Sequence, residues 1–232
     1  MYLYSLLEVS EQATNVVKWI SVGAVAVLLG AIALLGLLNK QKFDARKLAF
    51  SGICVAMSFA LAIFKFKIVQ FGGSITVASF VPILIYAYVY GVADGLIVGL
   101  IHGLLNFIES PYILTPATFI LDYLLPFASV ALMGFFGKKQ QEQPTLKPIV
   151  LGCVCVFCAR FFFHWLSGII FFLEGAIWDP LPGWAMQNAL LYSFIYQCVY
   201  IPLDAVIATM VLIFLTKSGV LHKLTALMKR KK

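Results

Sequence analysis

Charged side chains are scarce in this sequence, and long polar stretches are nearly absent. Asp, Glu, Lys and Arg make up 12% of the 232 residues, and hydrophobic residues make up 62%. Soluble globular domains carry about 25% charged and roughly 45–50% apolar residues. The shortage of charge excludes a soluble domain and indicates an all-α integral membrane protein, because this length holds six or seven spans of about 20 residues and little else.

Short motifs for hydrolytic chemistry are also missing. The sequence has no G-x-x-x-x-G-K-[ST] loop, so the chain does not hydrolyse ATP by that mechanism, and it has no H-E-x-x-H zinc motif. Scattered Ser, His and Asp residues do not make a catalytic triad. We therefore expect a protein that is not an enzyme and that has no cofactor or metal of its own.

Cysteines are few, and none is clearly paired in an external loop. Of the five, Cys153, Cys155 and Cys158 are close in sequence, but they fall in an uninterrupted apolar helix. Only the first and third come near to sharing a helical face, which disfavours a metal site. We expect all five to be reduced thiols.

The net charge of +7 reflects where the basic residues stand. They lie at the ends of apolar runs, which favours membrane topology over nucleic-acid binding. Segments 39–47 and 138–147 and the tail from residue 217 carry four, three and six Lys or Arg. The positive-inside rule places these segments in the cytoplasm, in a multi-pass plasma-membrane protein with its N-terminus outside and its C-terminus cytoplasmic.

Seven apolar runs are predicted to span the bilayer, at residues 16–38, 48–64, 77–90, 91–107, 115–136, 149–173 and 185–215. The connectors 65–76, 108–114 and 174–184 then lie together outside. They are rich in Gly, Pro, Tyr and Trp, and they form the predicted mouth of a pocket.

Several polar or ionisable side chains fall within these runs, and each such group is a candidate site because burying it in lipid is costly. Asp94 lies in the first turn of its helix, where a carboxylate complements the helix dipole, so we expect a structural role. Asp204 is expected to cap or pair locally. Two interpretations stay open for Arg160, an ion-pair partner or a snorkelling group, and for His102, a packing residue or a site residue.

Asp122 and His164 differ from these because each lies beside aromatic residues, toward the outer half of its span. Tyr123 follows Asp122, and His164 stands within a run of Phe and Trp at 161–165. Aromatic walls with a carboxylate suit a small, flat, partly cationic ligand. Interfacial anchoring is the alternative explanation of the aromatic run.

Small residues repeat at helical spacing in two of the runs. Gly91, Gly95, Gly99 and Gly103 stand one turn apart, which is typical of a close helix-packing seam in a membrane bundle. A second stripe comprises Gly52, Ala56 and Ala60. It is either internal packing or a docking surface for a membrane partner.

A resemblance to a known family follows from longer motifs. They are Gly72-Gly73-Ser74-Ile75-Thr76, Val81-Pro82-Ile83, the glycine run from Tyr90 to Leu104, Tyr112-Ile113-Leu114, Leu121-Asp122-Tyr123, Arg160-Phe161-Phe162-Phe163-His164, Ser167-Gly168 with Ile169 to Phe172, and Tyr192-Ser193 with Tyr196-Gln197. In this order and spacing, the chain from about residue 45 to 216 closely resembles the thiamine-specific substrate-binding (S) subunits of energy-coupling factor transporters.

The resemblance implies a six-helix S-component bundle that binds thiamine, with one extra N-terminal transmembrane helix. The implied organisation is an extra segment and basic linker (1–44), a substrate-binding membrane domain (45–216) and a basic cytoplasmic tail (217–232). The implied partners are a transmembrane coupling subunit and two ATP-binding cassette subunits, which alone use ATP, in a bacterial cell membrane. The small-residue stripe would meet the coupling subunit.

The same resemblance implies the binding residues. The carboxylate of Asp122 would hold the aminopyrimidine edge of thiamine, and the matching positions around it are Tyr112, Tyr123, His164, Phe172, Tyr192 and Gln197. Departures from the family pattern occur at some of them, where relatives can have Glu for Asp122, Trp for Phe172 and Asn for Gln197. The first external loop also lacks the Trp and Glu of some relatives.

Two alternatives remain at this stage. An S subunit for another flat vitamin or vitamin precursor would keep the architecture and change the loops. An intramembrane enzyme would need Asp94, His102 or Asp204 to gather around a metal or a nucleophile.

Overall fold

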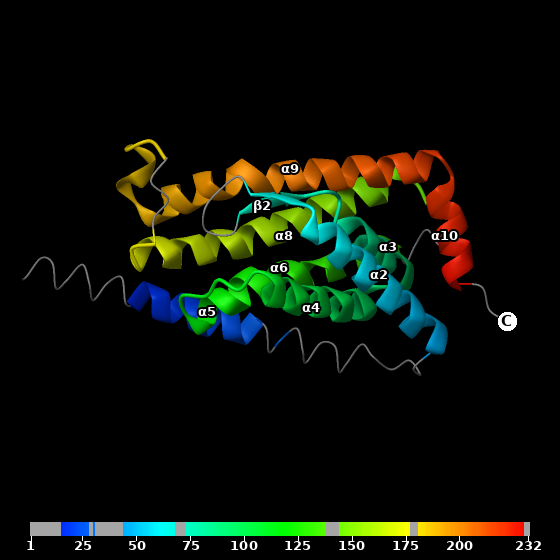
Figure 1. The fold of residues 1–232 in the computed structure, drawn as a ribbon, viewed down its shortest axis with the longest axis horizontal. Helices are drawn as coiled ribbons and strands as arrows, with labels where there is room; N and C mark the ends of the chain where they lie inside the picture. Colours follow the sequence, from blue (N-terminus) through cyan, green and yellow to red (C-terminus); the bar gives the residue numbers. More distant parts are fainter. Residues whose placement is uncertain are drawn as a thin grey trace, which may run out of the picture.

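The computed structural model describes residues 15–27, 30, 44–67, 73–137, 144–176 and 181–229. Figure 1 shows long helices running side by side, with α10 crossing one end of the bundle. Five helical segments of the described part are long and apolar enough to cross a bilayer: α2 (Ala45–Ile63), α4 (Val92–Glu109), a composite segment (Pro116–Gly137), α8 (Leu146–Leu173) and α9 (Ala189–Lys217). The predicted all-α membrane class is confirmed.

The short helix α3 (Phe80–Tyr90) occupies the centre of the bundle. Every residue from Phe80 to Val89 is buried, although the helix has only 11 residues. An apolar helix that is buried all round suits a core position. With the five long segments, α3 makes up the six helices expected for the main domain within the described residues.

The composite segment is irregular for a reason found in its sequence. It consists of α5 (Pro116–Phe119), the π-helix η1 (Ile120–Leu124), α6 (Leu125–Ala128), the 3-10 helix η2 (Ser129–Leu132) and α7 (Met133–Gly137). Pro126 has no N–H to donate to the carbonyl four residues earlier, that of Asp122. The N–H of Leu125 instead bonds the carbonyl of Ile120, five residues back. Such π-helical turns often occur at functional sites, and this one carries Asp122.

A β-hairpin stands where the sequence predicted only a Gly-rich connector. Strand β1 (Lys65–Lys67) pairs antiparallel with β2 (Ser74–Thr76), and Phe66 is opposite Ile75. Ile75 and Thr76 are buried, so β2 lies against the bundle. Three residues per strand leave too little alternation for a strand to be recognised from sequence.

A helix near the C-terminus was not predicted from the sequence either. The tail predicted from residue 217 contains α10 (Val220–Lys229), which follows a turn at Gly219. Leu221, Thr225 and Met228 share its buried face, and Tyr90 of α3 donates a hydrogen bond to the Met228 carbonyl. The tail is therefore partly an amphipathic helix that covers one end of the bundle.

Asp94 takes the structural role predicted for it at this same end. It lies in the first turn of α4 and forms an ion pair of 2.7 Å with Lys47 of α2. Lys47 also lies 5.4 Å from the ring of Tyr90. These contacts tie the ends of α2, α3 and α4 together.

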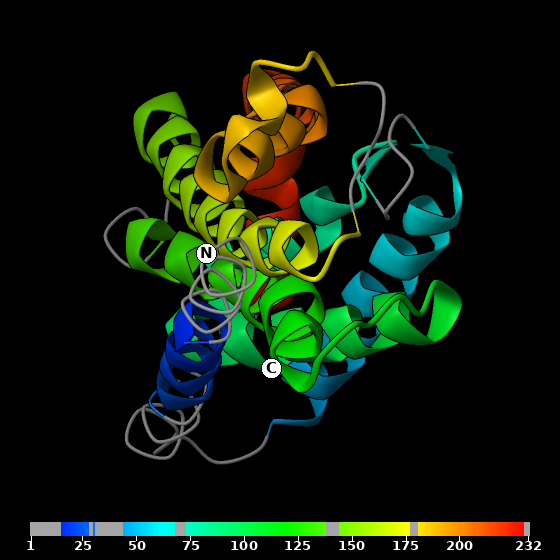
Figure 2. The same cartoon turned by 90° about the vertical axis from the view of Figure 1, so that its left-hand side faces the viewer.

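The N-terminal helix Asn15–Val27 lies on the outside of the bundle, as Figure 2 shows. It matches the first half of the span predicted at 16–38, and residues 28–29 and 31–38 lie outside the described part. The side chain of Ala24 is buried in a cluster with Leu121 and Ile170. The helix thus packs behind the segment that carries Asp122.

The sequence predicted a glycine seam without its partner, and in the structure the seam of α4 packs against the composite segment. A Cβ atom on Gly99 would collide with the Phe127 carbonyl, and one on Gly103 with the Tyr123 carbonyl. The two backbones can approach this closely only because glycine has no side chain. The seam sets the position of the turn that carries Asp122.

A valine at Gly103 is expected to lower the stability of the fold. The added side chain must push the Tyr123 carbonyl away, and overpacking of this kind costs about 1–3 kcal/mol. Thermal unfolding of the detergent-solubilised variant measures the effect. Gly52→Ala is the matched control, because nothing lies within 4 Å of a Cβ at Gly52. Equal melting temperatures for wild type and Gly103→Val would contradict the close approach.

Candidate ligand-binding site

A cavity opens between the hairpin, α4, the composite segment, α8 and α9. The cavity is partly enclosed and opens to the outside of the bundle at one mouth. Its lining residues are Lys65, Ser74, Thr76, Ser79, Phe80, Asn106, Ser110, Tyr112, Asp122, Tyr123, Phe127, Arg160, His164, Gly168, Phe171, Ala176, Tyr192, Tyr196, Gln197 and Tyr200. Of the seven predicted binding residues, all but Phe172 lie on this wall.

The carboxylate of Asp122 holds two neighbours on α8. Ser167 Oγ donates to Oδ2 at 2.6 Å, and His164 Nδ1 lies 2.9 Å from Oδ1. An ionised carboxylate only accepts, so a neutral His164 donates to it in the tautomer with the proton on Nδ1, which leaves Nε2 as an acceptor. Among the described residues Nε2 has no hydrogen-bond partner. The Asp122–His164 pair therefore presents two acceptors beside the cavity.

Aromatic rings form two further walls. Tyr112 stacks on Phe171, with ring centroids 5.3 Å apart and planes 11° apart. On α9, Tyr192 and Tyr196 lie 6.1 Å apart. Tyr112 lies in the connector between α4 and α5, where partial burial raises the pKa of its phenol. The rings offer flat, electron-rich faces to a planar or cationic guest.

The hydroxyl of Tyr123 forms hydrogen bonds with the backbone of the connector between α4 and α5. It accepts from the Tyr112 backbone N–H at 2.9 Å and donates to the Ser110 carbonyl at 2.7 Å. Tyr123 therefore fixes the connector that carries the Tyr112 ring. Its own ring also faces the cavity.

Gln197 is held in one orientation by α8 and α9. Its Nε2 donates to the His164 carbonyl at 3.1 Å, and its Oε1 accepts from Tyr200 at 2.6 Å. These partners assign the amide without ambiguity. They also link the predicted residue Gln197 to the backbone that carries His164.

Phe172 is the one predicted binding residue that does not line the cavity. It instead packs behind Tyr192, with ring centroids 5.1 Å apart. Consecutive helical residues point about 100° apart, so the neighbouring Phe171 takes the inward position. Ser167 was missed as well, although its place three residues after His164 puts both on one face of α8.

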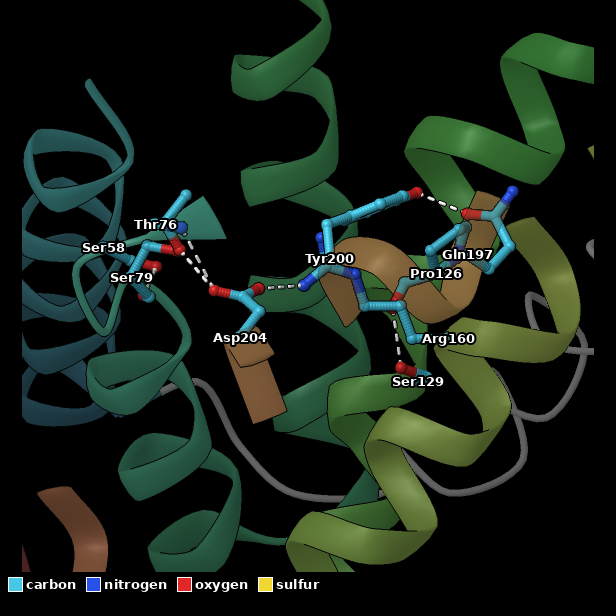
Figure 3. Close-up of polar contacts among 9 residues, drawn as sticks. All are labelled: Ser58, Thr76, Ser79, Pro126, Ser129, Arg160, Gln197, Tyr200 and Asp204. Atoms are coloured by element: carbon cyan, nitrogen blue, oxygen red, sulfur yellow. Dashed lines mark hydrogen bonds and ion pairs between the residues drawn. The ribbon is translucent and has the colours of Figure 1, made fainter. Parts of the chain in front are cut away.

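Arg160 of the cavity wall belongs to a buried ion pair, shown in Figure 3. Arg160 Nη1 lies 2.7 Å from Asp204 Oδ2, and the two side chains are 8% and 3% exposed. This settles the open question on Arg160 in favour of an ion pair. The expectation of local pairing for Asp204 was wrong, because its partners lie 44 and 128 residues away.

His102 remains outside this network. Its ring is fully buried against Phe80 and Phe127, and neither nitrogen has a hydrogen-bond partner in the described part of the chain. The surroundings of His102 therefore favour the packing interpretation.

The mouth of the cavity is bridged by a further ion pair. Lys65 of β1 pairs with Glu109 at the end of α4. The hairpin and α4 thus meet above the cavity. All five cysteines are free thiols, and within the described ranges no three His, Cys, Asp or Glu residues gather as metal ligands would.

The small-residue stripe of α2 faces outward. Gly52, Ala56 and Ala60 are exposed, whereas Cys54, Val55 and Ser58 of the same helix are buried. Internal packing among the described residues therefore does not use the stripe.

The profile of a family described as thiamine transporter protein (Thia_YuaJ) matches residues 48–223. The chain is similar to the thiamine transporter ThiT of Bacillus subtilis (strain 168), at 29% identity over 152 residues covering 62% of this chain and 75% of the relative. Its fold is similar to that of ThiT from Listeria monocytogenes, with a TM-score of 0.64 and 23% identity over 77% of this chain and 96% of that one.

Proposed function

The chain belongs to the thiamine transporter protein family, and from this we propose that it is the substrate-binding subunit of an energy-coupling factor importer, whose cavity captures thiamine. The match of the family profile to residues 48–223 confirms the resemblance predicted from the sequence. The proposal has three parts: the ligand, the side from which it enters, and the partners that move it inward.

Thiamine suits the cavity by its chemistry. It joins a flat aminopyrimidine to a thiazolium cation that bears a hydroxyethyl group. The carboxylate of Asp122 and Nε2 of His164 supply acceptors for the amino group, and the stacked Tyr112 and Phe171 offer aromatic faces to the rings. A cation also gains from the faces of Tyr192 and Tyr196. The observation that carries the proposal is the Asp122–His164 pair on an aromatic-walled cavity.

We place the mouth of the cavity on the outer face of the membrane. The opposite end carries α10 and the ion pair of Lys47, and most Lys and Arg of the sequence fall in the segments predicted to be cytoplasmic, 39–47, 138–147 and 217–232. The positive-inside rule then makes it cytoplasmic. The N-terminus lies outside in this arrangement.

The partners proposed are a transmembrane coupling subunit and two ATP-binding cassette subunits. The chain has no phosphate-binding loop of its own, so ATP hydrolysis falls to the partners. The exposed stripe of Gly52, Ala56 and Ala60 is the proposed docking surface, because small side chains let another helix approach closely.

An intramembrane enzyme finds no support in the positions of the polar residues. Asp94 pairs with Lys47, Asp204 pairs with Arg160, and His102 packs against aromatic rings. Each group is engaged separately, whereas a reaction centre needs them to converge on one point.

Calorimetric titration of the purified protein with thiamine tests the ligand. We expect saturable binding with one site and a Kd at or below about 1 µM. Tryptophan fluorescence should be quenched in the same titration. Pyridoxine and riboflavin, two other flat vitamins, serve as controls and are expected to bind far more weakly. Intact protein that ignores thiamine but gains thermal stability from another vitamin would replace the named ligand and keep the architecture.

A further inference from the structure

Asp204 accepts three hydrogen bonds although it lies in the middle of a membrane-spanning helix. Besides Arg160, its carboxylate receives the Thr76 backbone N–H at 3.2 Å and the Thr76 hydroxyl at 2.9 Å, both on Oδ1. Figure 3 shows Asp204 between Thr76 and Arg160. Charges inside a membrane are costly, and where they occur they are usually paired and functional. This pair therefore needs an explanation beyond helix packing.

The contacts of Asp204 connect three separate elements, α8, α9 and β2. Arg160 is on α8 and Asp204 is on α9, but Thr76 belongs to β2, which enters the bundle from the mouth of the cavity. The hairpin contributes Lys65, Ser74 and Thr76 to the cavity wall. A two-stranded hairpin is marginally stable by itself, so its position depends on what holds it. Asp204 is the buried charged group that holds it.

The turn after β2 depends on the same contacts. Ala78 has a φ of 59°, a left-handed conformation that is unfavourable for a residue with a side chain. The Thr76 hydroxyl also bonds Ser79 Oγ at 2.7 Å, and Ser58 of α2 donates to the Ser79 carbonyl. The turn is thus held on both sides, by α9 through Asp204 and by α2 through Ser58.

Arg160 completes the arrangement by neutralising Asp204. Its guanidinium carbon lies 4.2 Å from the centroid of the Phe80 ring, at the start of α3. The cation is therefore fixed between α9 and the first residue of α3, just after the strained turn. Removing the arginine would leave a buried carboxylate without a counter-charge, which is strongly unfavourable.

We propose that Asp204 is a positioning residue, which anchors the hairpin as a wall of the ligand cavity through Thr76 while Arg160 balances its charge. The consequence for binding rests on the proposed function: an anchored wall retains the bound ligand, so the anchor sets the dissociation rate more than the association rate. The anchoring itself does not depend on which ligand binds.

Hydrogen exchange of the full-length, ligand-free protein tests the anchor directly. Thr76→Val removes the hydroxyl, and with it the bonds to Asp204 and Ser79, at nearly unchanged side-chain shape. We expect the amides of residues 73–77 to exchange about tenfold faster, the factor for losing one hydrogen bond to a charged acceptor. Thr76→Ser keeps the hydroxyl and should restore slow exchange. Thr216→Val is the matched control, because Thr216 bonds its own helix at Leu212, and it should leave the hairpin unchanged.

Stopped-flow binding of thiamine to the same variants gives the second measurement. Thr76→Val should raise the dissociation rate severalfold and change the association rate little, with a melting temperature close to that of wild type. Asp204→Asn, which keeps an acceptor for Thr76 but leaves Arg160 uncompensated, should lower the melting temperature. Unchanged hairpin exchange in Thr76→Val would overturn the anchor. Faster exchange in a protein that ignores thiamine would uphold the anchor and refute only the proposed ligand.

Discussion

Thiamine binding is expected to weaken by about 100-fold when Asp122 is replaced by alanine. The carboxylate is the only acidic side chain on the cavity wall within the described residues, and it holds both His164 and Ser167. Removing one member of a buried, hydrogen-bonded charge contact costs about 2–5 kcal/mol, and 100-fold corresponds to about 2.7 kcal/mol. Part of the loss comes from His164, which would no longer be held in one orientation.

Three variants measured by calorimetry make this prediction specific. Asp122→Asn keeps the shape and should still lose most of the affinity, because it lacks the charge. Asp122→Glu restores the charge on a side chain one methylene longer and should bind better than the other two. Asp94→Ala is the control, since that carboxylate lies at the opposite end of the bundle and pairs with Lys47. Wild-type affinity in a folded Asp122→Ala protein would refute the assigned role.

Uptake of thiamine into cells is expected to be abolished by Ala56→Trp, while binding to the purified subunit remains. Ala56 is exposed on α2 in the middle of the small-residue stripe. A tryptophan there would keep a partner helix from the close approach that small residues allow. The variant does not reach the cavity, because no residue of α2 lines it.

The control for this experiment is a tryptophan elsewhere on the lipid-facing surface. Leu151 of α8 is 45% exposed, and Leu151→Trp should preserve both uptake and binding. Uptake is measured with radiolabelled thiamine in cells that express the coupling and ATPase subunits. Normal uptake by Ala56→Trp would show that the stripe does not contact the coupling subunit.

The site was predictable as far as it depends on residue type and local spacing. The aromatic surroundings of Asp122 and His164 suggested a pocket, and the structure brings the two side chains within 2.9 Å across 42 residues of sequence. The sequence could not show whether Phe171 or Phe172 lines the cavity. Neighbouring helical residues point about 100° apart, and the sequence does not show which of the two faces inward. Ser167 was within reach of sequence reasoning, since it shares a face with His164.

The buried ion pair and its contact with the hairpin could not be predicted in the same way. The residues that meet here, Asp204, Arg160 and Thr76, lie on separate elements. Nothing in their spacing along the sequence indicates that they are in contact. The hairpin was missed because its strands are three residues long, and α10 was missed because its sequence was taken for a basic tail. The contacts of Asp204 join segments that lie 44 and 128 residues apart.

The amino-acid sequence by itself determined that this is a helical membrane protein, where its spans lie, and that α4 packs through glycine. These properties follow from composition, from apolar periodicity and from the absence of a side chain at Gly95, Gly99 and Gly103, all of which act locally. Only the tertiary structure decided which polar groups meet. Pairing a buried charge is an interaction between distant segments, and its partner is chosen by how the helices pack and not by the order of residues along the chain.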